Sequence, residues 1–277
     1  RLSLMQLCLS QVCTLHASFE EDVEEYSSAA CNSLEVWLGK LEGYLERHSL
    51  DEAKALLGEH GVSIPVAAFQ GGLLESQGEK RAEHWDHFAR RLELCQQLGV
   101  ETLIVAADIV GPLSQQDIER VTTSLSQAAA QAGAAGMRLA LEFQARSALC
   151  NNLQTCAAMI ADTGSPHLGI CLDAFHLAIG PSKTEDLGYL SAENLFHVQL
   201  CDVAGAAREL AADADRILPG EGDFHLAPLL EHLKQINYAG TVSIELLNPQ
   251  VWENPPAQFA EIAMTALRKL LGMAKME

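Results

Sequence analysis

The sequence lacks an apolar run of the roughly 18 or more residues that a membrane-spanning helix needs. It also has little positive charge: 18 Lys and Arg stand against 37 Asp and Glu, a net charge of −19 over 277 residues. A surface this acidic repels phosphate backbones and anionic lipids, so the composition argues against partners made of nucleic acid or membrane. The hydrophobic share of 48% is typical of a packed globular chain.

The eight cysteines form no CxxC pair, which argues against a zinc ribbon, and most lie in apolar runs such as Ile170-Cys171-Leu172. This usage is typical of small core residues in a reducing cytoplasm. The first seven residues have the pattern of a strand rather than of a signal peptide, and the absence of an initial Met indicates trimming. We expect a cytoplasmic protein. The low aromatic content of 5% shows no clear interface anchor and leaves a homo-oligomer open.

Short apolar runs typical of β-strands alternate with longer amphipathic helical stretches along the whole chain. One such stretch is 82–98, where Phe88, Leu92 and Cys95 share a face. Gly61 and Gly99 stand where helices are expected to end, because glycine readily adopts the left-handed conformation that stops a helix. The predicted strands are Leu4–Leu9, Ser33–Leu38, Ser63–Ala68, Glu101–Ala106, Met137–Phe143, Leu168–Asp173, Leu195–Cys201 and Thr241–Leu246.

Eight strand–helix units with nearly continuous apolar strands indicate an α/β protein whose parallel sheet is buried on both faces. A closed (β/α)8 TIM barrel fits this number and the chain length. A doubly wound open sheet is the alternative, and it is disfavoured because no Gly-rich phosphate loop follows the first strand. No linker or low-complexity tract interrupts the sequence, so we expect one domain over residues 1–277.

Four consecutive predicted strands, the fifth to the eighth, carry a polar residue at or near their carboxyl ends: Glu142, Asp173, Gln199 and Glu245. Barrel active sites lie at this end of the strands. Three carboxylates in one mouth repel one another, and a divalent cation relieves that repulsion. Oxygen ligands favour Mg²⁺ or Mn²⁺. The alternative is that each acidic residue is only a solvated strand end.

Three histidines follow or lie within predicted strands. His176 comes three residues after Asp173, where it can reach a substrate or support a metal; a capping or surface imidazole is the alternative. His197 points to the same side as Gln199 one layer deeper, as a core histidine, a supporter of the metal site or a ligand in its own right. His16 follows the first strand and is a weaker candidate for the mouth.

Arg216 opens a loop rich in Gly and Pro between the last two predicted strands, over residues 216–224. A cation beside an acidic mouth suggests a clamp for a substrate oxygen or carboxylate. The alternative is a structural arginine paired with Glu221 or Asp223. The same acidic loop argues against a phosphorylated substrate.

Five segments resemble the xylose-isomerase-like barrels, a superfamily that includes sugar isomerases and epimerases, inosose and 3-dehydroshikimate dehydratases and the endonuclease IV group. The matching segments are Leu141-Glu142, Leu172–His176, Val198–Asp202, Leu218–Phe224 and Ser243–Glu245. Glu35, in Ser33–Trp37, matches the acidic second strand that these proteins often carry.

The resemblance implies one divalent metal ion (Mn²⁺, Mg²⁺, Co²⁺ or Zn²⁺). It also implies ligands that match, position by position, Glu142, Asp173, Gln199 and Glu245. It places His176 and Arg216 against the substrate, and we group His197 and Glu35 with them as candidate substrate-binding residues. Many epimerases of the superfamily have a histidine where this chain has Gln199, three residues before Asp202. Glutamine there looks more like the dehydroshikimate-dehydratase branch and several uncharacterised sugar-isomerase relatives.

The chemistry implied is removal of a proton from the carbon next to a carbonyl, with Glu142 and Glu245 as the catalytic carboxylates on opposite sides of the mouth. The leading expectation is an isomerase or epimerase acting through an enediolate on a small uncharged sugar or polyhydroxy keto compound. The alternative is a dehydratase in which His176 is the acid and Arg216 binds a carboxylate. An endonuclease IV-like nuclease is a distant third, and a non-catalytic sensor also stays open.

Overall fold

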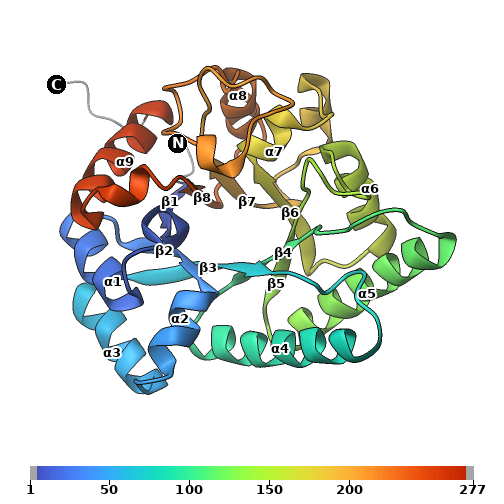
Figure 1. Ribbon diagram of the computed structural model, residues 1–277, viewed down its shortest axis with the longest axis horizontal. Coiled ribbons are helices and arrows are strands. Elements are labelled where there is room, and N and C mark those ends of the chain that lie inside the picture. The colour runs from blue at the N-terminus through green and yellow to red at the C-terminus, as the bar shows by residue number, and fades with distance from the viewer. Residues whose placement is uncertain (1–4, 273–277) are drawn as a thin grey trace.

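Eight parallel strands close into a barrel in chain order in the computed structural model of this protein, which describes residues 5–272 (Figure 1). Strand β1 pairs with β2 on one side and with β8 on the other, which closes the ring. The predicted (β/α)8 barrel is confirmed, and the open doubly wound sheet is wrong. The strands are β1 Gln6–Ser10, β2 Ser33–Trp37, β3 Ser63–Gln70, β4 Thr102–Ala106, β5 Arg138–Glu142, β6 Leu168–Asp173, β7 Leu195–Leu200 and β8 Thr241–Ile244.

The strand boundaries agree with the apolar runs to within about two residues, and β6 has the predicted bounds. Strand β8 ends at Ile244, so Glu245 lies one residue beyond it instead of inside it. Leu4, the predicted first residue of the first strand, lies outside the described residues.

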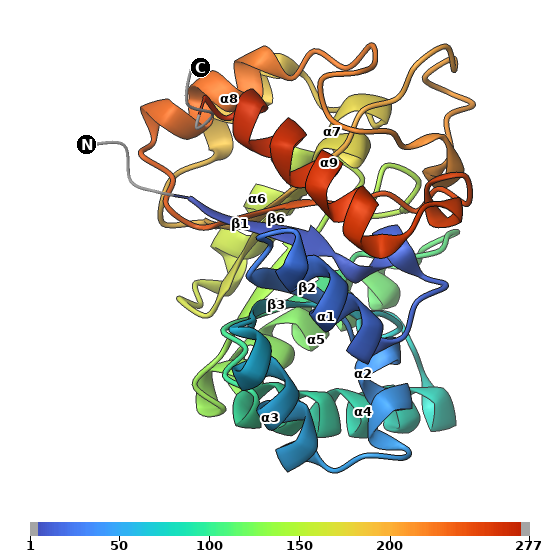
Figure 2. The ribbon, with the colours of Figure 1, turned by 90° about the vertical axis from the view of Figure 1, so that its left-hand side faces the viewer.

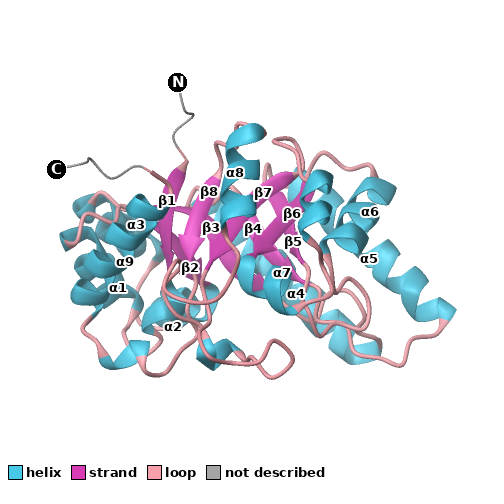
Figure 3. Cartoon of the chain, turned by 90° about the horizontal axis from the view of Figure 1, so that it is seen from above, coloured by secondary structure: helices cyan, strands magenta, loops and turns pink. Residues whose placement is uncertain are grey.

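The helices form the outer layer around the strands (Figure 3). They are α1 Phe19–Ser28, α2 Leu38–Leu45, α3 Leu50–His60, α4 Gly78–Gln97, α5 Gln115–Ala134, α6 Leu153–Thr163, α7 Ala174–Ile179, α8 Ala227–Gln235 and α9 Pro256–Leu270. Short 3₁₀ helices are η1 Gln11–Thr14, η2 Thr184–Tyr189, η3 Asp213–Asp215 and η4 Val251–Glu253.

Helix α4 buries the three residues that its sequence pattern predicts, Phe88, Leu92 and Cys95. Helix α3 ends at Gly61, whose φ of 62° is the left-handed conformation expected of it. Helix α9 packs against α1 and β1 (Figure 2) rather than simply covering the last strand, and it leaves Ile262 half exposed.

The apolar core has two parts, because strand side chains alternate between the barrel interior and the helix-facing side. A large cluster joins the strands to the surrounding helices, and a smaller one fills the interior with residues such as Ile104, Ala140 and Cys171. Within residues 5–272 all eight cysteines are free and buried, as expected of small core residues. No helix in that part of the chain is long and apolar enough to cross a membrane.

Candidate functional site

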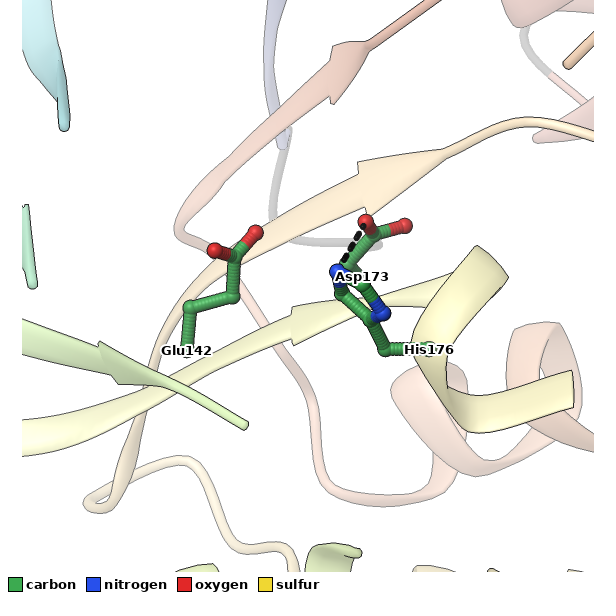
Figure 4. A group of neighbouring side chains, drawn as sticks. All are labelled: Glu142, Asp173 and His176. Carbon is green, nitrogen blue, oxygen red and sulfur yellow. Dashed lines mark ion pairs between the residues drawn. The ribbon is translucent and has the colours of Figure 1, made fainter. Parts of the chain in front are cut away.

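Strands β5 and β6 bring two carboxylates to the barrel mouth, and helix α7 adds an imidazole. Glu142 is the last residue of β5, Asp173 the last of β6, and His176 lies in the first turn of α7. One ligand atom from each of these residues lies within 4.8 Å of the others (Figure 4). His176 Nε2 is 3.7 Å from Asp173 Oδ2. The two carboxylates are almost completely buried, with exposed fractions of 7% for Glu142 and 0% for Asp173.

The start of helix α7 fixes the Asp173 carboxylate. Its Oδ1 accepts a hydrogen bond of 2.8 Å from the backbone N–H of Phe175, as an N-cap does. Its Oδ2 lies 2.8 Å from Nη2 of Arg216, yet no hydrogen-bond donor within residues 5–272 is directed at it. The contact is therefore an ion pair without a directed N–H, and this buried oxygen keeps an acceptor position open.

Arg216 is almost completely buried, with 2% of its side chain exposed, and its guanidinium lies among carboxylates. Nη1 donates to Glu245 Oε2 at 3.1 Å, and Nη2 and Nε donate to Asp213 Oδ1 at 2.8 and 3.0 Å. The guanidinium carbon lies 4.3 Å from the centre of the Phe175 ring, a cation–π contact. Arg216 therefore joins Asp173 and Glu245, which come from separate strands, to the loop outside the barrel.

The alternative pairing of Arg216 with Glu221 or Asp223 is wrong. Asp223 Oδ2 instead accepts from the backbone N–H of Gly205, because the chain folds back at this point. Asp202 holds the base of the loop: its carboxylate accepts from the backbone N–H groups of Gly220 at 3.0 Å and Phe224 at 2.9 Å.

Asp202 and Ile217 also form a two-residue antiparallel bridge, with two backbone hydrogen bonds of 2.9 Å. The segment 203–216 thus leaves and returns at one fixed point of the barrel mouth. Its part 204–210 is exposed, whereas Arg216 at its end is buried.

Burial and neighbouring charge set the ionisation of the site. Burial, and next the Asp173 carboxylate, raise the pKa of Glu142 to about 8, although Gln144 donates a hydrogen bond to it at 3.1 Å. Burial raises the pKa of Glu245 well above its usual range even though Arg216 acts in the opposite direction. Burial also lowers the pKa of His176, which favours its neutral form. The mouth therefore holds more carboxylate than the guanidinium balances.

A second polar group lies deeper in the barrel, around Glu35 on β2. Its Oε2 accepts from Nε2 of His197 at 2.7 Å and from the Ser243 hydroxyl, and its Oε1 accepts from Nε2 of Gln199 at 3.0 Å. His197 Nδ1 is hydrogen-bonded to Thr241 Oγ1 at 2.7 Å. Burial alone would raise the pKa of Glu35, but the contacts with His197, Ser243 and Gln199 leave it below the usual value.

Glu35 and His197 have exposed fractions of 0% and contact each other beneath the mouth. The prediction that they bind substrate directly is therefore not supported by their placement. A role in supporting the residues above them fits better, because Glu35 fixes the amide of Gln199 with its N–H₂ turned inward. His16, the weaker candidate, is exposed in a turn after η1.

The four predicted ligands are brought together only in part. Glu142 and Asp173 form one group, and His176, which the sequence placed against substrate, joins them. Glu245 is instead held by Arg216. Gln199 is engaged by Glu35, and its Oε1 lies 3.3 Å from a cysteine thiol.

Sequence reasoning missed Asp213, whose carboxylate makes two hydrogen bonds to the Arg216 side chain. The only signal available was the spacing of three residues between them, which places both on one side of a helical turn. That turn is η3, Asp213–Asp215.

The donor set fits a divalent cation. Carboxylate oxygens of Glu142 and Asp173 lie close to an imidazole nitrogen of His176. Asp173 Oδ2 is buried with an open acceptor position, and the raised pKa of Glu142 reflects its burial and the neighbouring Asp173 carboxylate. A divalent cation satisfies both conditions with ligands of the type that Mn²⁺, Mg²⁺ or Zn²⁺ accepts.

Comparison with known proteins gives a consistent result. The family model described as "Xylose isomerase-like TIM barrel" matches residues 23–270. An inosose isomerase from Bacillus velezensis is 26% identical over 259 residues, which cover 90% of this chain and 91% of that protein. A 3-dehydroshikimate dehydratase from Pseudomonas putida is 24% identical over 272 residues, 95% of this chain but only 41% of that protein.

Among solved structures, the IOLI protein with a bound zinc atom superposes with a TM-score of 0.90 at 22% identity, covering 99% of this chain and 100% of that one. At this identity the likeness concerns the fold.

Proposed function

This chain belongs to the xylose isomerase-like TIM barrel family, and we propose that it is a metal-dependent isomerase or epimerase of a small polyhydroxy ketone of the inosose class. One observation carries the proposal: two buried carboxyl groups lie on either side of Asp173, Glu142 at the end of β5 and Glu245 one residue beyond β8, and burial raises the pKa of both. The inosose isomerase relatives, which match over most of their length, support the substrate class.

The carboxyl pair supplies a base and an acid in one site. Burial raises the pKa of both carboxyl groups, so either can hold a proton near neutral pH, and ionisation of one of them leaves the pair with a base and an acid. The ionised carboxylate takes a proton from the carbon next to the substrate carbonyl. The protonated one returns a proton to the opposite face or to the neighbouring carbon, which yields the epimer or the isomer.

We propose Glu142, Asp173 and His176 as the residues that hold a divalent cation, with Glu245 joining them. Such a cation supplies Lewis-acid stabilisation of negative charge that develops beside a carbonyl. The carboxylates favour Mn²⁺ or Mg²⁺, and the imidazole admits Co²⁺ or Zn²⁺. The neutral form of His176 that burial favours is the form that binds metal.

The chemistry of the mouth favours an uncharged substrate. Arg216 is paired with the Asp213 carboxylate of the protein itself, and a mouth lined by carboxylates repels phosphates and carboxylates.

The proposal is tested by exchange and turnover. Protein loaded with Mn²⁺ is incubated with an inosose in D₂O, and NMR follows incorporation of deuterium next to the carbonyl and the appearance of an isomer. We expect both in the wild type and neither in Asp173→Asn. Lys54→Gln, an exposed change on α3, is the control expected to behave as the wild type. If metal-loaded wild type incorporates no deuterium into inososes or ketoses, the proposal is wrong.

A dehydratase is the second candidate, favoured by Gln199, which resembles the dehydroshikimate-dehydratase branch, and by the dehydratase relatives. In this reaction, a base removes the proton next to the carbonyl, and the departing hydroxyl takes up a proton and leaves as water. Loss of water creates a conjugated product, so ultraviolet absorbance after addition of 3-dehydroshikimate distinguishes the two functions.

A further inference from the structure

The Arg216 guanidinium occupies the position of a cation among the candidate ligands. It contacts Asp173 Oδ2 at 2.8 Å and Glu245 Oε2 at 3.1 Å, and it is buried. Strands β6 and β8 are separated by β7, so this side chain is a charged bridge across the mouth. The group within 4.8 Å that includes Asp173 does not include Glu245, whose carboxylate Arg216 holds instead.

A divalent cation and this guanidinium compete for the same oxygen atoms. Both are positive, both need the lone pairs of Asp173 and Glu245, and like charges repel strongly at a buried position. The Arg216 contact with Asp173 Oδ2 lacks a directed N–H, so it is the less firmly held of the two carboxylate contacts.

Arg216 has a second set of partners that remains when these two carboxylates are withdrawn. Asp213 accepts two hydrogen bonds from it, on the loop side, and the Phe175 ring lies against the guanidinium face. The Asp213 side chain is 56% exposed, so this partner lies at the outer side of the mouth. The guanidinium can release the barrel carboxylates without losing every partner, because Asp213 and Phe175 still compensate its charge.

We propose that Arg216 is the internal counter-ion of the metal-free site, and that metal binding requires it to release Asp173 and Glu245 while it keeps Asp213 and Phe175. The inference rests on the proposed metal site and adds a competitor to it. The measured affinity for metal is then set by the difference between two free energies: that of the metal binding to Asp173 and Glu245, and that of the Arg216 guanidinium binding to the same carboxylates. Neutralising Arg216 has two opposite effects: the metal-free protein loses its counter-ion, and the metal gains affinity.

The test measures Mn²⁺ binding to chelator-treated protein by competition with an indicator, together with the melting temperature with and without Mn²⁺. In Arg216→Gln we expect the Kd for Mn²⁺ to fall at least about tenfold, corresponding to about 1.4 kcal/mol. We also expect the melting temperature of the metal-free protein to fall and the increase caused by Mn²⁺ to widen. The single ammonium of Arg216→Lys cannot bridge two carboxylates as the forked guanidinium does. We expect its Kd for Mn²⁺ and its melting temperature to lie between those of the wild type and of Arg216→Gln.

Arg208→Gln is the matched control, because it makes the same change at an exposed arginine of the same loop and is expected to leave both quantities unchanged. Binding of Mn²⁺ to Arg216→Gln that is equal to or weaker than in the wild type, with circular dichroism showing a folded protein, overturns the inference. If Arg216→Gln does not fold, the same comparison is decided by Arg216→Lys. Absence of Mn²⁺ binding to the wild type would overturn the proposed metal site itself, a distinguishable failure.

Discussion

Glu35→Gln tests whether the Glu35 carboxylate is the acceptor that holds the polar group beneath the mouth together. The carboxylate has no exposed surface and accepts from His197 at 2.7 Å, from Ser243 and from Gln199 at 3.0 Å. A glutamine keeps the shape and one acceptor oxygen, but its N–H₂ group then faces a donor. Loss of the carboxylate leaves buried donors without their acceptor, which costs about 1–3 kcal/mol, so we expect a loss of this size in the free energy of unfolding.

The measurement is urea unfolding of the metal-free protein followed by circular dichroism, where the midpoint is expected to fall without a change in slope. Glu24→Gln, the same change at an exposed position of α1, is the control, with an expected effect within about 0.5 kcal/mol. Because the pKa of Glu35 is lowered in the folded protein, its contribution is present above its unfolded pKa and is lost as the pH falls through its folded pKa. The difference between variant and wild type should therefore shrink in acid.

A double-mutant cycle with His197→Gln completes the experiment. Residues that share a buried pair are expected to show a coupling free energy of about 1–3 kcal/mol. A loss below about 1 kcal/mol in Glu35→Gln, or strictly additive effects in the cycle, would refute the assignment of Glu35 as the shared acceptor of this group.

Three further predictions concern other parts of the molecule. Burial raises the pKa of Asp22 to about 6, so the folded protein holds this proton more tightly than the unfolded chain does. The free energy of unfolding should therefore decline by about 1.4 kcal/mol per pH unit between about pH 4 and pH 6. In urea titrations, Asp22→Asn should lack this part of the decline. In Gly169→Ala the new Cβ would lie 2.5 Å from the Phe196 ring, which must shift, so calorimetry should show a loss of about 1–3 kcal/mol; Gly58→Ala, with nothing within 4 Å, should show none. Glu142→Gln removes a candidate base or acid, and kcat for the interconversion should fall about 10²- to 10⁴-fold; an unchanged kcat excludes Glu142 from proton transfer.

The barrel could be predicted because each of its strands and helices is encoded by a pattern of residues that are close together in the sequence. The run Leu168–Asp173 is apolar throughout and ends in a carboxylate, and the structure gives β6 the same bounds. The helical period of Phe88, Leu92 and Cys95 likewise places these three residues on the buried face of α4. Once each strand is known, the common carboxyl edge of a parallel barrel places Glu142 and Asp173 close together.

The contacts of the site could not be predicted in the same way, because closure of the barrel determines them. Arg216 has acidic residues nearby in sequence, and those suggested Glu221 and Asp223 as partners. The structure pairs it instead with Asp213, three residues away, and with Asp173 and Glu245, which are far away along the chain. No sequence pattern reports that selection.

The same limit explains Glu35 and His197. Their polarity suggested contact with substrate, yet they satisfy each other across the interior over a separation of 162 residues. Spacing within β7 places His197 one layer below Gln199, but it does not indicate that Glu35, far away along the chain, is the partner of His197 there.

The pinned base of the loop 203–216 has a consequence for how this protein can change. Because Asp202 and Ile217 hold the two ends together, the length of the segment between them has little influence on the barrel. The entropy of closing a loop grows only slowly with its length, by about 0.6 kcal/mol for each doubling. Insertions and deletions in the exposed stretch 204–210 are therefore expected to change the free energy of unfolding little, while Arg216 keeps its position beside Ile217. This loop offers the chain a place to diversify, by evolution or by library design, with its carboxylate cluster left intact.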